Sequence, residues 1–328
     1  MAVLVTGGAG YIGSHTVAEL IDRKEEIIIL DNLEKGHKEA VLGAKLIIGD
    51  LRNKELLMKV FLENEIEAVV HFAAYIEVGE STINPVKYYQ NNLMCTLNLI
   101  ECMSKAGVPK MVFSSTAAVY GEPENIPIKE KDKSVPTNPY GETKLAVEKA
   151  LKWAESAHGI KHIILRYFNA CGAHVSGCIG EDHNPETHLI PLVLNTALGK
   201  RESIKIFGND YNTQDGTCVR DYVHVTDLSN AHLLALDSLR ANKPSNVYNL
   251  GNGKGFSVKE VIDMASTITG IKIKEESVPR RIGDPSVLVA SSDKIKSELG
   301  WKPQMQDLAT IINTAWNWHK KHPNGYSL

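Results

Sequence analysis

A tyrosine and a lysine one helical turn apart, in Tyr140-Gly-Glu-Thr-Lys144, form the pair best suited to move a proton. A tyrosine with its usual pKa near 10 is a poor base at neutral pH, and a neighbouring cation favours its phenolate form. Lowering the tyrosine pKa to about 7 requires about 4 kcal/mol of differential stabilisation. The Lys144 ammonium and the helix N-terminus would share this task with any positive charge bound beside them.

The position of this pair separates it from a chance match, which a chain of this composition contains about once. Asn138 suits an N-cap and Pro139 the first helical position, so Tyr140 falls in the first turn of a helix expected over 140–157. The hydroxyl residues Ser114-Ser115-Thr116 precede it at the end of an expected strand. Thr116 could therefore hydrogen-bond the same substrate hydroxyl, although a threonine at a strand end more often has no such role.

The first 31 residues have the pattern of a dinucleotide-binding unit. A short apolar run at 2–6 leads directly into Gly7-Gly8-Ala9-Gly10-Tyr11-Ile12-Gly13 and then into a helical pattern. Such glycines let the backbone lie against a pyrophosphate, whose charge the free N–H groups of a helix N-terminus stabilise. Asp31 ends the next strand-like run, where it can accept hydrogen bonds from a ribose diol and repel a 2′-phosphate. The sequence therefore predicts a site for NAD rather than NADP.

Strand-like and helix-like stretches alternate from residue 2 to about residue 168. Further strands are expected at 45–48, 68–72, 111–115 and 162–167, and helices at 54–63, 92–105 and 140–157. This alternation predicts an α/β fold with a Rossmann-type, doubly wound parallel sheet. Ligands of such sheets bind at the carboxyl ends of the strands. Those ends carry Asp31, Asp50-Leu51, Phe72-Ala73-Ala74, Ser114-Ser115-Thr116 and Tyr167-Phe168-Asn169.

The pattern loosens after Asn169. A loop is expected over 172–186, a strand and turn over 205–212, and short helices over 258–267 and 308–319. The glycine cluster at 251–255 lacks the Lys-Ser/Thr of a P-loop, so we expect a turn there. Residues 1–168 are expected to form an NAD-binding domain. Residues 169–328 are expected to form a smaller C-terminal α/β substrate-binding lobe, with allowance for segments that cross back to the first domain.

Composition excludes several classes of protein. The 36 basic and 39 acidic residues are interspersed, and a net charge of −3 gives no reason to expect binding to nucleic acid or an anionic membrane. No apolar run approaches the roughly 20 residues that a membrane-spanning helix needs, and no basic segment of a signal peptide precedes the first strand. Five cysteines without a Cys-x-x-Cys motif predict no disulfide framework, no metal and a cytoplasmic location.

Two of the expected helices carry more apolar surface than one core-facing stripe needs. On 92–105, Leu97 and Leu99 point in different directions, and on 140–157 both Leu151 and Trp153 are apolar. A helix that is apolar most of the way round is buried on two sides. Burial beneath the second lobe and burial in a subunit interface both remain open, and we expect a homodimer through these two helices.

These residues resemble a known family. Gly7-x-x-Gly10-x-x-Gly13, Asp31, Ser114-Ser115-Thr116 and Tyr140-x-x-x-Lys144 are similar to the motifs of the extended short-chain dehydrogenase/reductases. Longer motifs narrow the resemblance to the UDP-glucose 4-epimerase family, among them Val78-Gly-Glu-Ser81, Arg166-Tyr-Phe-Asn169 and Gly216-Thr-Cys-Val-Arg-Asp-Tyr-Val-His224. This resemblance extends from one end of the chain to the other.

The resemblance implies reversible epimerisation of UDP-galactose and UDP-glucose at C4 through a 4-keto intermediate, in galactose metabolism, with a tightly held NAD. Tyr140 would take the proton from the sugar 4-hydroxyl, Lys144 would depress the tyrosine pKa and hold the nicotinamide ribose, and Thr116 would help carry the proton. The expected cofactor contacts are Gly7, Gly10, Tyr11, Ile12, Gly13, Asp31, Asn32, Asp50, Leu51, Phe72, Ala73, Ala74, Asn91, Ser114, Tyr140, Lys144, Tyr167 and Phe168. The expected substrate contacts are Thr116, Asn169, His188, Leu189, Lys205, Phe207, Arg220, Tyr222, Arg280, Asp284 and Leu288.

Three positions depart from the family pattern. Ile76 stands where many members have a lysine that touches the NAD ribose, and His188 replaces a common asparagine beside the diphosphate. Leu288 occupies a position where a tyrosine often narrows the sugar pocket. The smaller leucine predicts weak activity on UDP-N-acetylglucosamine beside the main pair of substrates.

Three other functions are associated with similar motifs. A sugar-nucleotide 4,6-dehydratase typically carries Asp-Glu directly after the threonine to protonate the leaving hydroxyl, whereas Ala117-Ala118 follow Thr116 here. An epimerase of UDP-xylose and UDP-arabinose would leave little trace in the motifs and stays open. A non-catalytic, NAD-sensing binding protein would usually have lost the tyrosine–lysine pair, which this chain keeps.

Overall fold

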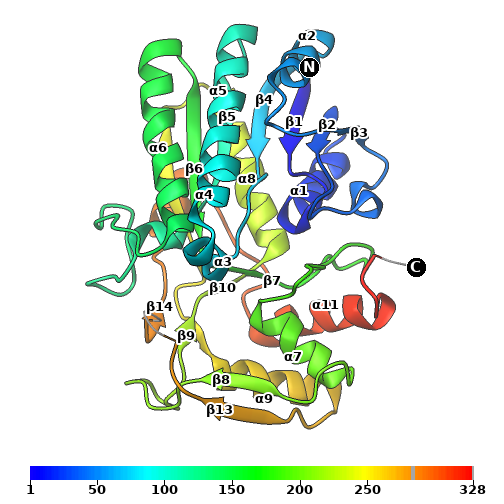
Figure 1. Cartoon of the computed structure of the whole chain (residues 1–328), viewed down its shortest axis with the longest axis vertical. Helices are drawn as coiled ribbons and strands as arrows, with labels where there is room; N and C mark the ends of the chain where they lie inside the picture. Colours follow the sequence, from blue (N-terminus) through cyan, green and yellow to red (C-terminus); the bar gives the residue numbers. More distant parts are fainter. Residues whose placement is uncertain (282–284, 327–328) are drawn as a thin grey trace.

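The computed structural model describes residues 1–281 and 285–326. Seven parallel strands form the central sheet in the order β11-β6-β5-β4-β1-β2-β3 (Figure 1). The strands are β1 (Ala2–Thr6), β2 (Ile27–Asp31), β3 (Lys45–Ile48), β4 (Ile66–His71), β5 (Lys110–Thr116), β6 (Lys161–Tyr167) and β11 (Asn246–Leu250). The order reverses between β1 and β4, the kind of switch point at which such sheets bind ligands. The predicted doubly wound fold is confirmed.

Helices cover both faces of this sheet, so its strands are apolar on both sides. Helices α1 (Tyr11–Asp22) and α8 (Val225–Arg240) pack with Val3 and Val5 on one face. Helices α2 (Lys54–Glu63), α5 (Cys95–Ala106) and α6 (Pro139–His158) pack with Ala2 and Leu4 on the other. The alternation of side chains along β1 thus supplies both halves of the core. None of the described helices is long and apolar enough to cross a membrane.

The connection from β4 to α5 is more irregular than the sequence predicted. It contains α3 (Val78–Ile83), α4 (Pro85–Tyr88) and a π-helical segment, η2 (Tyr89–Met94), that runs directly into α5. Within η2, Asn92 accepts a hydrogen bond from the Tyr75 N–H at 2.8 Å and donates one to the Tyr75 carbonyl at 2.9 Å. The helix expected from residue 92 therefore begins in a widened turn that fixes the loop after β4.

The smaller lobe lies below the sheet in Figure 1. Its helices are α7 (Leu189–Ala197), α9 (Val258–Thr269) and α11 (Leu308–Lys321), which share one apolar core. Three small sheets accompany them: β8 (Ile204–Phe207) with β13 (Glu275–Val278), β7 (Asn169–Cys171) with β10 (Tyr222–His224), and β9 (Val219–Arg220) with β12 (Phe256–Ser257) and β14 (Val287–Leu288).

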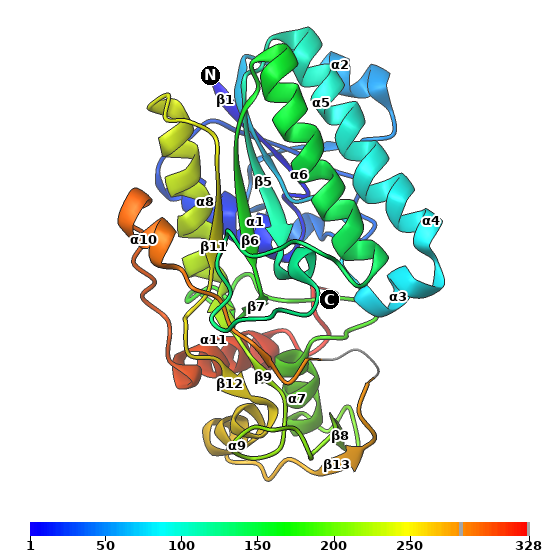
Figure 2. The same cartoon turned by 90° about the vertical axis from the view of Figure 1, so that its left-hand side faces the viewer.

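Part of the C-terminal half returns to the first domain. Helix α8 packs along α1, and β11 adds the outermost strand beside β6 (Figure 2). The following helix α10 (Asp293–Leu299) and Trp301 join the same core. Trp301 also donates from Nε1 to the Asp227 carbonyl at 3.0 Å. The chain therefore leaves the first domain near residue 168 and later returns to it, so a single boundary at residue 168 does not separate the two lobes.

Candidate active site

The glycine turn after β1 leaves backbone exposed where a ligand can approach. Gly7 has φ +73°, and a Cβ there would lie 2.5 Å from the Ala73 nitrogen. A Cβ at Gly13 would lie 2.1 Å from the Gly7 carbonyl oxygen, so both glycines are required by the packing of the turn. At Gly10, the N-cap of α1, a Cβ would meet only the Gly7 oxygen, at 3.4 Å. This open cradle at a helix N-terminus fits the pyrophosphate of a dinucleotide.

Asp31 at the end of β2 keeps the capacity to bind a ribose. Its buried carboxylate accepts hydrogen bonds from the backbone N–H groups of Ala9, at 3.0 Å, and Leu33, at 2.9 Å, one on each oxygen. Each oxygen therefore retains a lone pair. Burial raises the Asp31 pKa, and the two N–H groups oppose that rise. Nearby, the Asn32 side chain donates to Asp50 at 2.9 Å, which ties the ends of β2 and β3 together.

The tyrosine–lysine pair stands where the sequence placed it, in the first turns of α6. The Asn138 side chain caps the helix by accepting a hydrogen bond from the Gly141 N–H at 2.9 Å, and Pro139 occupies the first helical position. Tyr140 is 9% exposed and Lys144 4% exposed. Lys144 Nζ donates to the Ser114 carbonyl at 2.9 Å, so the helix is joined to the carboxyl end of β5.

The protonation equilibria of this pair differ from the sequence expectation. Burial raises the pKa of Tyr140 to about 12, and a hydrogen bond with Thr116 only partly opposes it. Burial likewise lowers the pKa of Lys144 to about 7, which weakens it as a cation at neutral pH. The residues of this chain alone do not lower the Tyr140 pKa, so the expected lowering depends on the bound cofactor and stays a prediction. A positive charge on a bound cofactor ring would lower the Tyr140 pKa.

The remaining predicted cofactor contacts also gather at this edge of the sheet. Phe72 donates its N–H to the Thr6 carbonyl at 2.9 Å, and its ring contacts that of His232 in a tilted arrangement, with centroids 4.7 Å apart. Tyr11 donates from its hydroxyl to the Gly172 carbonyl at 2.5 Å, which links the glycine turn to the smaller lobe. The Tyr167 hydroxyl forms a short hydrogen bond with Ser114 Oγ. Asn91 donates to Asn92 Oδ1 at 3.2 Å in η2.

The predicted substrate contacts lie mainly on the short strands of the smaller lobe. Phe207 ends β8 and receives the Arg281 guanidinium at 3.9 Å from its ring centroid. Arg280 donates from Nε to Asp210 Oδ1 at 2.7 Å. Lys205 is exposed on β8, Arg220 lies on β9, and Asn169 begins β7. Arg281 was missed by sequence reasoning, although it directly follows a predicted contact.

Two further predicted substrate residues, Tyr222 and Leu288, are at least half-buried. The Tyr222 ring belongs to the buried core of the smaller lobe, and its contact with the substrate stays a prediction. Leu288 on β14 is half-buried and packs with Phe168 against Val119 and Tyr120, at the carboxyl end of β6. That location agrees with a role beside the reacting sugar. Asp284 lies outside the described residues.

Comparisons with known proteins agree with this geometry. A model of the NAD dependent epimerase/dehydratase family matches residues 3–251. The chain belongs to this family. It is 56% identical to a UDP-glucose 4-epimerase of Halalkalibacterium halodurans, over 100% of this chain and 98% of the relative. The expected family resemblance and NAD dependence are confirmed.

Solved structures of the family superpose closely on this chain. A crystal structure of a UDP-glucose 4-epimerase matches with a TM-score of 0.98 and 53% identity, over 100% of both chains. A UDP-glucose 4-epimerase from Bifidobacterium longum in complex with NAD+ and UDP matches with a TM-score of 0.94 and 40% identity, over 99% of this chain and 100% of that one.

Beneath the catalytic pair, this member of the epimerase/dehydratase family has a buried polar network that sequence reasoning missed. Glu148 accepts hydrogen bonds from Ser115 Oγ at 2.6 Å and from Arg166 Nε at 3.0 Å. Arg166 Nη1 donates to the Tyr120 hydroxyl at 2.9 Å, and that hydroxyl donates to Asn249 Oδ1 at 2.7 Å. The signal was present in the sequence, since Glu148 follows Lys144 by four residues and so shares its helix face. The network joins α6 to β5, β6 and β11.

Proposed function

We propose that this chain interconverts UDP-glucose and UDP-galactose by NAD-dependent epimerisation at C4. The observation that carries the proposal is the burial of Tyr140, Thr116 and Lys144 together at the carboxyl edge of the sheet that also bears the glycine cradle. The activities named for the full-length relatives support the choice of sugar nucleotide.

The residues of the chain account for the proton transfers of such a reaction. Bound NAD supplies a reversible acceptor for the hydrogen on C4. Tyr140 takes the proton from the 4-hydroxyl oxygen and returns it after the 4-keto sugar has turned over. Thr116, hydrogen-bonded to Tyr140, shares that proton. Lys144, fixed by the Ser114 carbonyl, holds the nicotinamide ribose.

Alternative reactions of the same family have weaker support. The two residues after Thr116 are alanines at the start of a 3₁₀ turn, η3 (Ala117–Tyr120), so the acid that a dehydratase uses there is missing. A UDP-xylose or UDP-arabinose epimerase would use the same pair. We favour the hexoses because the named relatives act on them, with weak activity on UDP-N-acetylglucosamine because of Leu288.

Retention of the cofactor tests the closed redox cycle. An enzyme that reoxidises its NAD within each turnover has no reason to release it, so protein purified without added nucleotide should carry NAD. Denaturing the protein and assaying nicotinamide in the supernatant measures this directly. A supernatant free of nicotinamide, from protein that is otherwise folded, would count against the cycle.

We also propose that the chain is a homodimer through α5 and α6, which lie side by side in both views (Figures 1 and 2). Trp153 is 76% exposed and Leu97 42% exposed on these helices, and Met94 just before α5 is also exposed. Leu151 is fully buried in the core, so its suggested role in the interface is replaced by Trp153. Sedimentation should show a wild-type dimer that Trp153→Asp dissociates. A wild-type monomer would contradict the proposal.

A reducing cytoplasm is the proposed location. All five cysteines are free, and four of them are buried. Burial raises the pKa of the Cys171 thiol well above its usual value, so this thiol stays protonated and unreactive.

A further inference from the structure

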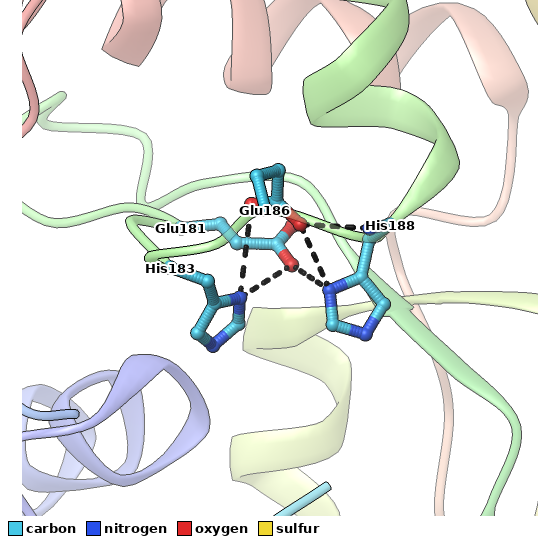
Figure 3. Close-up of side chains that lie close together, drawn as sticks. All are labelled: Glu181, His183, Glu186 and His188. Atoms are coloured by element: carbon cyan, nitrogen blue, oxygen red, sulfur yellow. Dashed lines mark hydrogen bonds and ion pairs between the residues drawn. The ribbon is translucent and has the colours of Figure 1, made fainter. Parts of the chain in front are cut away.

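The segment between β7 and α7 brings two histidines and two glutamates together. Their side chains point toward one another from a single stretch, Glu181-Asp-His183-Asn-Pro-Glu186-Thr-His188 (Figure 3). One nitrogen or oxygen of each side chain lies within 4.8 Å of the corresponding atom of the others. We refer to Glu181, His183, Glu186 and His188 as the 181–188 cluster.

The distances in the 181–188 cluster match the edges of a tetrahedron around a small metal ion. Zinc bound at about 2.0–2.1 Å to nitrogen and oxygen holds its ligand atoms about 3.3 Å apart. Here Glu181 Oε1 lies 2.8 Å from His188 Nδ1 and 3.2 Å from His183 Nδ1. Glu186 Oε1 lies 3.2 Å from His188 Nδ1, and the other oxygen of this carboxylate, Oε2, lies 3.7 Å from His183 Nδ1. These separations bracket the expected edge.

The direction of the His183 ring indicates a shared centre rather than a pairwise contact. Among the described residues, no acceptor meets the buried Nδ1 of His183 with hydrogen-bond geometry. The Glu181 oxygen is close enough for a hydrogen bond, at 3.2 Å, but lies off the axis of the nitrogen, and the nearest Glu186 oxygen is 3.7 Å away. A ligand between the four atoms would satisfy this nitrogen.

The charges of the cluster are compatible with a bound cation. Glu181 and Glu186 have side chains only 5% and 12% exposed. The ion pairs found for them among the described residues involve histidines alone, without a lysine or arginine. Two carboxylates withdrawn from water need compensating charge, which either two protonated histidines or one divalent ion would supply.

The surrounding contacts hold the ligands in place before any ion binds. Trp318 Nε1 donates to the Glu181 carbonyl at 3.3 Å, and His37 Nε2 lies 2.9 Å from the Asp182 carbonyl. Glu186 Oε1 accepts hydrogen bonds from the Thr187 and His188 N–H groups, both at 2.7 Å. The segment is therefore anchored on α11 and on the first domain, as the outer contacts of metal ligands usually are.

We propose that the 181–188 cluster binds one divalent transition-metal ion of the zinc class, with His183 Nδ1, His188 Nδ1 and one oxygen from each glutamate as ligands. Four protein ligands close a tetrahedral site, which makes it structural rather than catalytic. Imidazole nitrogens select zinc and its neighbours over magnesium and calcium. The sequence expectation of no metal rested on cysteine spacing and overlooked this histidine–glutamate set.

A metal here would act on substrate binding through His188, a consequence that rests on the proposed function. His188 is the N-cap of α7, and its Nδ1 faces the cluster while Nε2 points away (Figure 3). A metal on Nδ1 fixes the tautomer that carries its proton on Nε2. His188 is then held as a hydrogen-bond donor for the diphosphate, at the start of a helix whose dipole favours an anion.

The test uses tag-free, full-length protein with its NAD retained, at pH 7.5. The protein is treated with a chelator, dialysed, titrated with ZnCl₂ and freed of excess metal, and its zinc is then counted by mass spectrometry. Wild type should hold about one zinc per chain, and zinc should raise its Tm by about 5–10 °C. Co²⁺ in place of zinc should give the intense visible absorption of a tetrahedral site.

The variant His183→Asn should lose the zinc, the Tm response and the cobalt spectrum. The matched control is His174→Asn, in the same segment but outside the cluster, which should keep all three. If His183→Asn does not fold, removal of zinc from wild type by chelator and its restoration provide the same comparison of Tm. Wild type that takes up no zinc, or a control that loses zinc as completely as His183→Asn, would overturn the metal site.

Steady-state kinetics distinguish an effect of zinc on substrate binding from an effect on turnover. Loss of zinc should raise KM for UDP-galactose several-fold and leave kcat within about twofold, because His188 is a positioning residue. An unchanged KM in zinc-free protein would overturn the role of His188 in binding, whereas zinc content and Tm report on the metal even if the protein fails to epimerise.

Discussion

The tyrosine–lysine pair and the expected UDP contacts lie on secondary-structure elements of very different size. Tyr140 and Lys144 lie on the 20-residue helix α6, packed against a seven-stranded sheet. Phe207, Arg220 and Leu288 lie on strands of four, two and two residues. A long helix on a large sheet fixes a side chain through many contacts, whereas a short strand relies on few.

The ion pairs of the two regions differ in the same way. Glu148 and Arg166 are buried under α6, with side chains 3% and 7% exposed. Arg280 and Asp210, in the smaller lobe, have side chains 46% and 70% exposed. A buried pair cannot rearrange without leaving a charge unpaired, but an exposed arginine can exchange its carboxylate for a ligand phosphate. The tyrosine–lysine pair therefore lies beside a buried ion pair, whereas the expected substrate contact Arg280 belongs to an exposed one.

The largest effect on activity is expected from a substitution on α6. Tyr140→Phe removes the hydroxyl that moves the proton, and should lower kcat by about two to four orders of magnitude with little change in UDP-sugar affinity. Steady-state kinetics and UDP-sugar titration measure the two quantities. A variant with more than about a tenth of wild-type turnover would remove Tyr140 as the base.

Glu148→Gln should destabilise the same region. It leaves the Arg166 guanidinium buried without its counter-charge, at a cost of about 3–5 kcal/mol in the free energy of unfolding. Glu142→Gln, on the exposed face of α6, is the matched control and should change little. Denaturant unfolding measures the free energy of unfolding of both variants. Equal losses in the two would show that the buried network does not stabilise α6.

Leu288 should affect specificity more than rate. Tyrosine fills more space beside the sugar than leucine, and such pocket effects are worth about 1–3 kcal/mol, or roughly 10- to 200-fold in kcat/KM. Leu288→Tyr should abolish activity on UDP-N-acetylglucosamine and largely spare UDP-galactose, and Leu288→Ser should raise the weaker activity. Equal use of both substrates by wild type, or an unchanged ratio in Leu288→Tyr, would refute this account of the pocket.

The smallest effect on stability is expected at the exposed pair. Asp210→Asn removes the partner of Arg280, and because both groups are open to solvent the Tm should not change measurably. The freed arginine should bind the diphosphate at least as well, so KM for UDP-galactose should stay equal or fall. A clear loss of Tm would show that this part of the lobe is as tightly built as the sheet.

The same contrast explains what the sequence predicted. The sheet strands from β1 to β6 and the long helices between them were predicted because their apolar patterns are strong and follow one another locally, whereas the short helical segments between β4 and α5 were not. The return of α8 and β11 to the first domain was not located, because β11 pairs with a strand about 80 residues earlier and nothing local marks that partner.

The site shows a similar division. Residue types and spacing sufficed to place Asp31 at the end of β2 and Tyr140 and Lys144 at the start of α6, and their roles there stay predictions. Depth of burial did not follow from spacing, so neither the raised pKa of Tyr140 nor the core position of Tyr222 was foreseen. The metal-ligand geometry of Glu181 and His188 depends on loop conformation, which the pattern of residues does not encode.

Turnover of UDP-galactose tests the central claim most directly. Purified protein, with no NAD added, is mixed with UDP-galactose, and any UDP-glucose formed is oxidised by a coupled UDP-glucose dehydrogenase supplied with its own NAD. The account predicts a steady NADH signal that depends on the protein and falls by about two to four orders of magnitude with Tyr140→Phe. No signal from folded protein that carries NAD, or an undiminished signal from Tyr140→Phe, would contradict it.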